Sequence, residues 1–112
     1  MQALWAEADE LVTASVTFVE VRSAIARRLR GRARNRARRN LADRWSELVA
    51  IDVDGLLLHF AAAAADEHGL RALDAIHLAA GQLSAEGEFL FGTFDHELRR
   101  AARAAGFATA PA

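Results

Sequence analysis

The sequence has no cysteine, no lysine and no long apolar run. Without cysteine, both a disulfide framework and a thiolate metal site are excluded, so any metal would be bound by carboxylates, hydroxyls, histidines or water. No apolar stretch approaches membrane-spanning length, and acids stand near the start where a signal peptide would carry basic and apolar residues. These absences predict a cytoplasmic protein that does not contact the membrane.

The length and the hydrophobic content of the chain suit a single domain. A chain of 112 residues, of which 53% are hydrophobic, is long enough and apolar enough to bury a single core. We therefore expect one domain over residues 1–112.

The charges are unevenly distributed along the chain. No acid lies between Glu20 and Asp43, whereas this stretch carries nine arginines: Arg22, Arg27, Arg28, Arg30, Arg32, Arg34, Arg36, Arg38 and Arg39. Because the net charge is only -1, the remaining chain is distinctly acidic. A basic stretch of this kind is typical of contact with phosphate backbones. Arginine also serves simply to solvate helix surfaces, and both interpretations remain open.

Hydrophobic periodicity and capping residues predict strands that alternate with helices. We expect strands at 11–14, 49–53 and 88–91, with a short edge strand at 107–109. We expect helices at 3–8, from an N-cap at Ser15 to near Gly31, at 33–48, from an N-cap at Asp54 to Gly69, around Asp74, and at 96–105. This alternation favours an α/β sandwich with a parallel sheet, and the apolar third strand predicts burial on both of its faces.

The helix around Asp74 is amphipathic. Leu73, Ile76, His77 and Ala80 recur at helical spacing and form its predicted buried stripe, with Asp74 in the first turn beside it. A carboxylate in a first turn is stabilised by the helix N-terminus wherever it occurs, so Asp74 is either such a residue or a ligand.

Two further acids occupy positions that matter in a parallel sheet. Functional groups gather beyond the carboxyl ends of the strands, where Glu20 follows the first strand and Asp95 follows the third. Each acid also has an ordinary explanation, since Glu20 could be solvated and Asp95 could be an N-cap with Thr93 in the turn. If the three acids meet, like charges raise one another's pKa, and a hard divalent cation removes the repulsion. The histidines show no zinc pair, and His77 is expected to be a hydrogen-bonded residue near the core.

Three segments closely resemble the PIN-domain family, and the likeness is greatest to the VapC-type toxins of bacterial toxin-antitoxin pairs. These segments are residues 11–15 with 19–22, residues 69–79, and residues 93–95. The resemblance implies a Mg²⁺- or Mn²⁺-dependent endoribonuclease with acids at the centre of a parallel sheet. It implies catalytic, metal-binding roles for Glu20, Asp74 and Asp95, and substrate-binding roles for Thr93, Ser15 and Arg22. It also implies an RNA substrate, a cognate antitoxin protein and a homodimer.

The sequence departs from the family at its start. Family members open with a central strand that ends in an aspartate, and the sequence contains no such segment, so we expect an N-terminally truncated PIN-like domain. Without this central strand, the metal site would lack one carboxylate, and two inner strand edges of the sheet would be unpaired. Three functions follow as alternatives: a metal-dependent ribonuclease, a catalytically incompetent remnant that binds RNA or an antitoxin without turnover, and a fold stable only when a partner covers its open edge.

Overall fold

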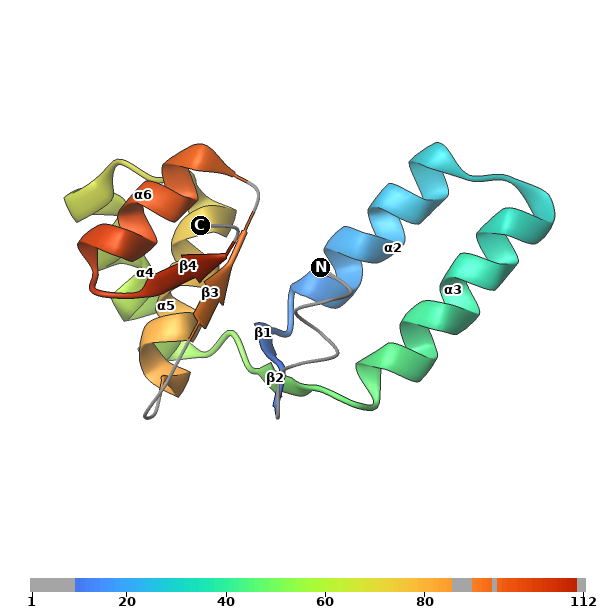
Figure 1. Ribbon diagram of the computed structural model, residues 1–112, viewed down its shortest axis with the longest axis horizontal. Helices are drawn as coiled ribbons and strands as arrows, with labels where there is room; N and C mark the ends of the chain where they lie inside the picture. The colour runs from blue at the N-terminus through green and yellow to red at the C-terminus, as the bar shows by residue number, and fades with distance from the viewer. Residues whose placement is uncertain (1–9, 86–89, 94, 111–112) are drawn as a thin grey trace.

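The computed structural model describes residues 10–85, 90–93 and 95–110. Strands and helices alternate as predicted (Figure 1). In chain order they are β1 (Val12–Ala14), α2 (Thr17–Arg28), α3 (Gly31–Trp45), β2 (Val49–Ile51), α4 (Gly55–His68), α5 (Ala72–Ser84), β3 (Leu90–Gly92), α6 (His96–Ala104) and β4 (Ala108–Ala110). The helical turns predicted at 3–8, and the first half of the strand predicted at 88–91, lie outside the described residues.

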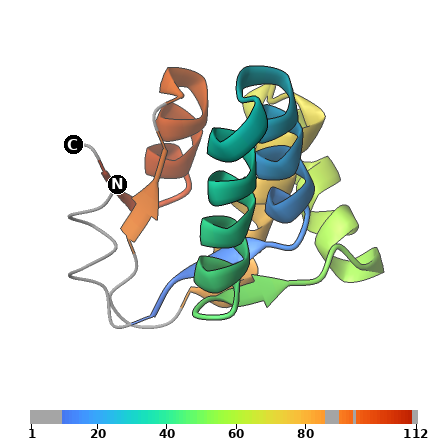
Figure 2. The same cartoon turned by 90° about the vertical axis from the view of Figure 1, so that its right-hand side faces the viewer.

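The four strands pair in parallel, which confirms the α/β class, and they form two separate sheets. β1 pairs with β2 in the register Val12 to Val49, and β3 pairs with β4 in the register Leu90 to Ala108. Among the described residues no ladder joins β1 to β3, and Figure 2 shows the two pairs apart. Each sheet therefore has an edge that faces the other sheet across α5.

The core forms where α4 packs against α5. Leu57 and Leu78 are the largest fully buried side chains. Alanines surround them on both helices, and these small side chains allow the two helix backbones to approach closely. The Phe91 ring of β3 packs over Gly81, where an added Cβ would lie 3.1 Å from the ring. Gly81 thus lets β3 lie close against α5.

Two burial predictions are wrong. Leu73 of α5 is 44% exposed, because the helix turns Ala75, Leu78 and Ala79 toward the core instead. Leu90 of β3 is also exposed and only Phe91 is buried there, so this strand is covered on one face. The apolar sequence of this strand does not reveal that only one face of the β3–β4 sheet is covered here.

Of the caps predicted for α2 and α4, two are confirmed and one is wrong. The Asp54 side chain accepts a hydrogen bond from the Leu57 N–H at 2.9 Å, and Gly69 ends α4 with a left-handed backbone at φ 66°. Ser15 is not the N-cap of α2. Val16 takes that position without a side-chain hydrogen bond, while the Ser15 N–H donates to the Ile51 carbonyl and extends the β1 to β2 ladder.

Helices α2 and α3 form a hairpin that extends away from α4, α5 and α6 (Figure 1). The Phe18 and Trp45 rings meet edge to face at its base, with centroids 5.2 Å apart. Near its tip, Arg34 of α3 donates from Nε to the Leu29 carbonyl at 3.1 Å, and from its guanidinium to the Ala26 carbonyl at 2.8 Å. These bonds satisfy carbonyls at the end of α2 and fix the angle between the two helices. We call this hairpin, residues 17–45, the arm.

Candidate functional site

A hydrogen bond between two helices defines one side of the site. His77 Nε2 lies 2.7 Å from Glu20 Oε1, which joins the first turns of α2 to the middle of α5. Both side chains are partly exposed. The prediction that His77 is hydrogen-bonded near the core is therefore confirmed. Among the described residues Glu20 forms no ion pair with a basic residue of its own helix. Its hydrogen-bond partner, His77, lies 57 residues further along the chain, on α5.

Asp74 lies one turn before His77 on the same face of α5, since residues three apart are neighbours on a helix surface. Burial raises the pKa of Asp74 above its ordinary value of 3.8, and the negative charge of Asp95 raises it further. His77 and Arg71 oppose this rise, and Glu20 adds a smaller increase. The charges of both other predicted acids thus act on the Asp74 carboxyl group. We call Glu20, Asp74 and Asp95 the acid cluster.

Asp95 serves as the N-cap of α6. Its Oδ1 accepts a hydrogen bond from the Leu98 N–H at 2.8 Å. Its own N–H donates to Thr93 Oγ1 at 3.1 Å, so Thr93 shapes the turn between β3 and α6. Arg99 donates to the Thr93 carbonyl at 2.9 Å and holds this turn from the other side. The prediction that Asp95 is an N-cap is therefore confirmed. Capping uses one oxygen of its carboxylate and leaves the second oxygen for a ligand.

Among the described residues no contact joins the other two predicted substrate-binding residues, Arg22 and Ser15, to the acid cluster. The Arg22 guanidinium lies over the Phe18 ring, 5.9 Å from its centroid. Arg22 is two residues from Glu20 on α2, and residues so spaced point to different faces of a helix. Ser15 lies between β1 and α2 and makes only backbone hydrogen bonds. The substrate-binding roles of Ser15, Thr93 and Arg22 stay predictions.

The donor chemistry of the acid cluster suits a hard divalent cation, but the cluster does not form a ligand cage. Within residues 10–85, 90–93 and 95–110, no three His, Asp or Glu side chains lie together closely enough to hold a metal ion. One oxygen of Glu20 is bonded to His77 and one of Asp95 caps α6. Mg²⁺ and Mn²⁺ use carboxylate oxygens together with several waters, so few protein ligands are needed. The carboxylates are therefore of the type that such an ion prefers, and Glu20 and Asp95 each keep one oxygen that makes no hydrogen bond within the described residues.

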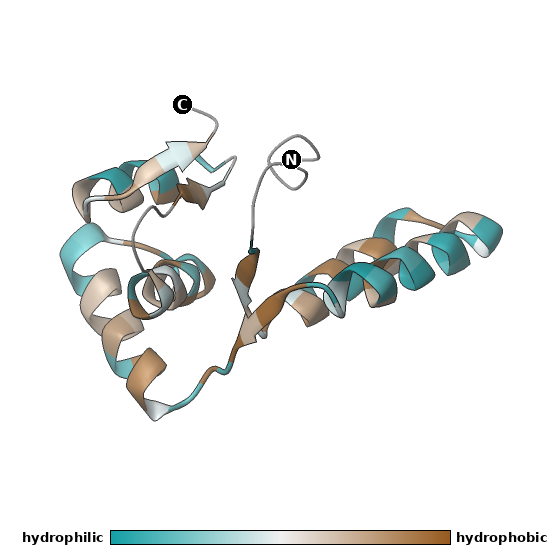
Figure 3. Ribbon diagram, turned by 60° about the horizontal axis from the view of Figure 1, so that its bottom comes forward, coloured by the Kyte–Doolittle hydropathy of each residue, from teal (hydrophilic) through white to brown (hydrophobic). Residues whose placement is uncertain are grey.

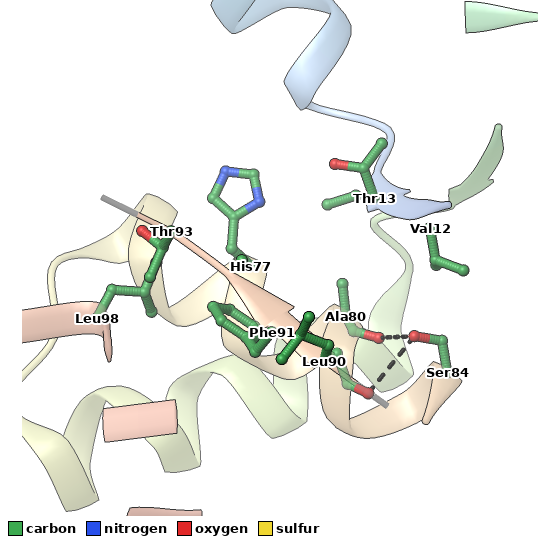
Figure 4. A pocket seen from close by; sticks show the side chains of 12 residues that line it. Val12, Thr13, His77, Ala80, Ser84, Leu90, Phe91, Thr93 and Leu98 are labelled. Carbon is green, nitrogen blue, oxygen red and sulfur yellow. Dashed lines mark hydrogen bonds between the residues drawn. The ribbon is translucent and has the colours of Figure 1, made fainter. Parts of the chain in front are cut away.

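A cavity of about 290 Å³ lies beside the acid cluster, between the two sheets (Figure 4). Val12 and Thr13 of β1 line one side, and Leu90 and Phe91 of β3 line the other. Small residues of α5 form its floor, where Ser84 donates to the Ala80 carbonyl at 2.7 Å. His77 and Thr93 also line the cavity, so its wall includes neighbours of the acid cluster. The space between the facing strand edges is thus continuous with the surroundings of the predicted site.

Sequence reasoning missed three contributors to this site. It did not pair His77 with Glu20, it gave no role to Arg71 beside Asp74, and it did not foresee the hold of Arg99 on Thr93. The spacing of Asp74 and His77 by three residues was a usable indication, because it places both on one helix face. The two arginines carry no such pattern, since their roles depend on how separate elements pack.

The alternation of parallel strands and helices, with acids that follow the strands, agrees with a comparison of the sequence with known families. A PIN domain matches residues 1–104, and the chain belongs to the PIN-domain family. Two relatives come from Mycobacterium tuberculosis: Ribonuclease VapC45 of strain CDC 1551 / Oshkosh and Ribonuclease VapC49 of strain ATCC 25618 / H37Rv. Each is 29% identical to this chain over 115 residues, which cover 98% of this chain and 80% of the relative. The resemblance inferred from the three sequence segments is therefore confirmed.

Proposed function

We propose that this protein is a Mg²⁺- or Mn²⁺-dependent endoribonuclease, the toxin of a toxin-antitoxin pair, that hydrolyses RNA phosphodiester bonds. Membership of the PIN-domain family and two relatives named VapC ribonucleases support the reaction class. Among the described residues no helix is both long and apolar enough to cross a bilayer. We place the protein in the cytoplasm, where its RNA substrate lies.

The observation that carries the proposal is the placement of the acids: Asp74 lies one turn before His77 on α5, His77 is hydrogen-bonded to Glu20 of α2, and the pKa of Asp74 is raised. Burial raises it first, and the charges of Asp95, the N-cap of α6, and Glu20 of α2 raise it further, so two acids from other elements act on Asp74. Such mutual repulsion costs folding free energy, and proteins retain it chiefly where the site has a task. Glu20, Asp74 and Asp95 are therefore the proposed catalytic and metal-binding residues.

Each residue has a separate part in this proposal. A bound Mg²⁺ or Mn²⁺ would supply a water of lowered pKa and neutralise negative charge on the phosphodiester. His77 holds Glu20 by one oxygen when the cation is not bound, which keeps this side chain oriented. Asp95 is held by the N-terminus of α6, and Thr93 and Arg99 hold the turn that carries it. Two of the three carboxylates are thus oriented before any ligand binds.

The family also suggests partners for this chain. We propose that a cognate antitoxin protein silences the toxin by inserting a peptide toward the acid cluster, and that the protein works as a homodimer. A cationic side chain of such a peptide would be attracted to the acid cluster, where Asp74, Asp95 and Glu20 concentrate negative charge. Copurification with the product of a neighbouring small reading frame, and sedimentation of the free chain, would test these two partners.

The direct test is cleavage of a fluorescent RNA with and without Mg²⁺ or Mn²⁺. Asp74→Asn keeps the shape of the side chain and removes its charge, so we expect the rate of cleavage to fall by about 100-fold or more, since even outer neighbours of a metal ion contribute 10–100-fold. Asp66→Asn is the matched control, because Asp66 is an exposed acid on α4. Cleavage that persists at the wild-type rate in Asp74→Asn would refute the assignment.

A second candidate is a module that binds RNA or an antitoxin without turnover. The observation in its favour is that no ligand cage forms within the described residues, where Glu20 and Asp95 each have one oxygen engaged. This candidate predicts salt-sensitive RNA binding that is unchanged by Asp74→Asn and is followed by no product. Metal-dependent cleavage by the 112-residue chain would exclude it.

A further inference from the structure

The arm carries an excess of positive charge. Within the described part of the chain, none of the nine arginines between Arg22 and Arg39 forms an ion pair with a carboxylate. Helix α3 has no buried residue, and its hydrophilic surface is seen in Figure 3. Arg34 is used to hold α3 to α2, but most of the other arginines are exposed. Residues 22–39 of the arm thus form a protruding stretch in which every charged side chain is positive.

The arginines of the arm lie on different sides of it with respect to the acid cluster. Arg27 follows Glu20 by seven residues on α2, which is nearly two full turns, so both lie on one helix face about 10 Å apart along the axis. Arg28 lies beside Arg27 in the last turn, and both are exposed. Arg36 and Arg39 of α3 are also exposed. They lie on the face of α3 opposite Arg34, whose side chain reaches α2, and so they point away from α2.

The arm has few means of recognition other than charge. Its aromatic residues are Phe18 and Trp45, and these rings pack against each other at its base. The arm therefore offers no free aromatic side chain on which a nucleic-acid base could stack. Exposed arginines bind phosphate by bidentate hydrogen bonds and by charge. The matching ligand is a polyanion recognised through its backbone and not through its bases.

We infer that the arm binds the phosphate backbone of single-stranded RNA, and that Arg27 and Arg28 guide the strand along α2 to the acid cluster. The inference rests on the proposed function, and it adds the surface that holds the substrate. Arg27 is the cation of the arm that shares a face with Glu20, so a strand that crosses the acid cluster reaches it within about two helical turns. Arg36 and Arg39 attract RNA from solution but do not contact the strand in the site.

The test compares two double variants of equal charge. Arg27→Gln/Arg28→Gln and Arg36→Gln/Arg39→Gln each remove two positive charges from the arm. Binding of fluorescent single-stranded RNA is measured by anisotropy in EDTA, so that no cleavage takes place, over a range of salt concentrations. We expect the first variant to bind about 10-fold or more weakly and to lower the slope of log K against log salt by about 1.4, because each phosphate contact on a single strand contributes about 0.7. We expect the second to bind within about threefold of wild type, with a nearly unchanged slope.

Other outcomes would overturn the inference. Equal losses in the two variants would show that the arm attracts RNA only by its total charge. Unchanged binding in both would show that its arginines merely solvate the helices. Circular dichroism and urea unfolding of each variant establish that the arm still folds. Failure of the proposed function shows itself separately, as intact RNA binding in EDTA with no cleavage after Mg²⁺ is added.

Discussion

His77 and Glu20 are joined by a hydrogen bond of 2.7 Å that connects the arm to α5. Glu20 belongs to α2 and His77 to α5, so the pair joins the arm, which protrudes in Figure 1, to a helix of the core. It positions one acid of the proposed site and also attaches the arm to the core.

The first prediction concerns the energy of this pair. A double-mutant cycle with Glu20→Gln and His77→Ala should give a coupling free energy of about 1 kcal/mol, because hydrogen bonds to charged groups contribute about 1.5–3 kcal/mol and this pair is partly exposed. Urea unfolding of the two single variants and the double variant measures it. A coupling indistinguishable from zero would show that the bond does not attach the arm.

The second prediction concerns the effect of pH on stability through Asp74. Because the folded-state pKa of Asp74 is raised above 3.8, the folded chain holds this proton more tightly than the unfolded chain. Deprotonation therefore costs stability as pH rises from 3.8 through the folded-state pKa, and the cost is absent below pH 3.8. Relative to wild type, Asp74→Asn should become more stable between about pH 3 and about pH 7. The exposed control Asp66→Asn should show no such trend, and a parallel pH profile for both variants would contradict the role of burial.

The third prediction concerns the hydrogen bonds of Arg34 within the arm. Arg34→Gln should lower the free energy of unfolding by about 1 kcal/mol, since two charged hydrogen bonds to partly exposed carbonyls are lost. Amide hydrogen exchange near the start of α3 should become faster. Arg36→Gln removes the same charge from an exposed side chain and should change neither quantity. Equal effects of the two substitutions would mean that charge and not hydrogen bonding stabilises the arm.

The fourth prediction concerns the facing edges of the two sheets. Within the described residues β1 pairs only with β2, and β3 only with β4, so each leaves backbone donors and acceptors at an edge. If a second copy covers these edges, the unfolding midpoint should rise with protein concentration. A dimer should gain about 1.4 kcal/mol of apparent stability for each tenfold increase. A sharp transition of a monomer, independent of concentration, would contradict this.

Local patterns in the sequence predicted the strand and helix order, the caps at Asp54 and Gly69, and the place of Asp74 in the first turn of a helix. These features depend on near neighbours in the chain: a cap needs an acceptor three residues before an N–H, and an amphipathic helix needs apolar residues at helical spacing. The likeness to the PIN-domain family also rested on local segments, and the match of a PIN domain to residues 1–104 confirms it. Ser15 was wrong as an N-cap because its backbone is used by the β1 to β2 ladder, which involves Ile51, 36 residues further along.

The sequence by itself thus determined the class of the fold, the positions of the acids along the chain and the charge of the arm. Only the tertiary structure decided that His77 meets Glu20, that burial and Asp95 act on Asp74, and that the strands divide into two sheets. The physical reason is the range of the interactions. Hydrogen bonds within a turn and helical periodicity are encoded over a few residues, whereas contacts between helices and the burial of a carboxylate depend on how the whole chain packs.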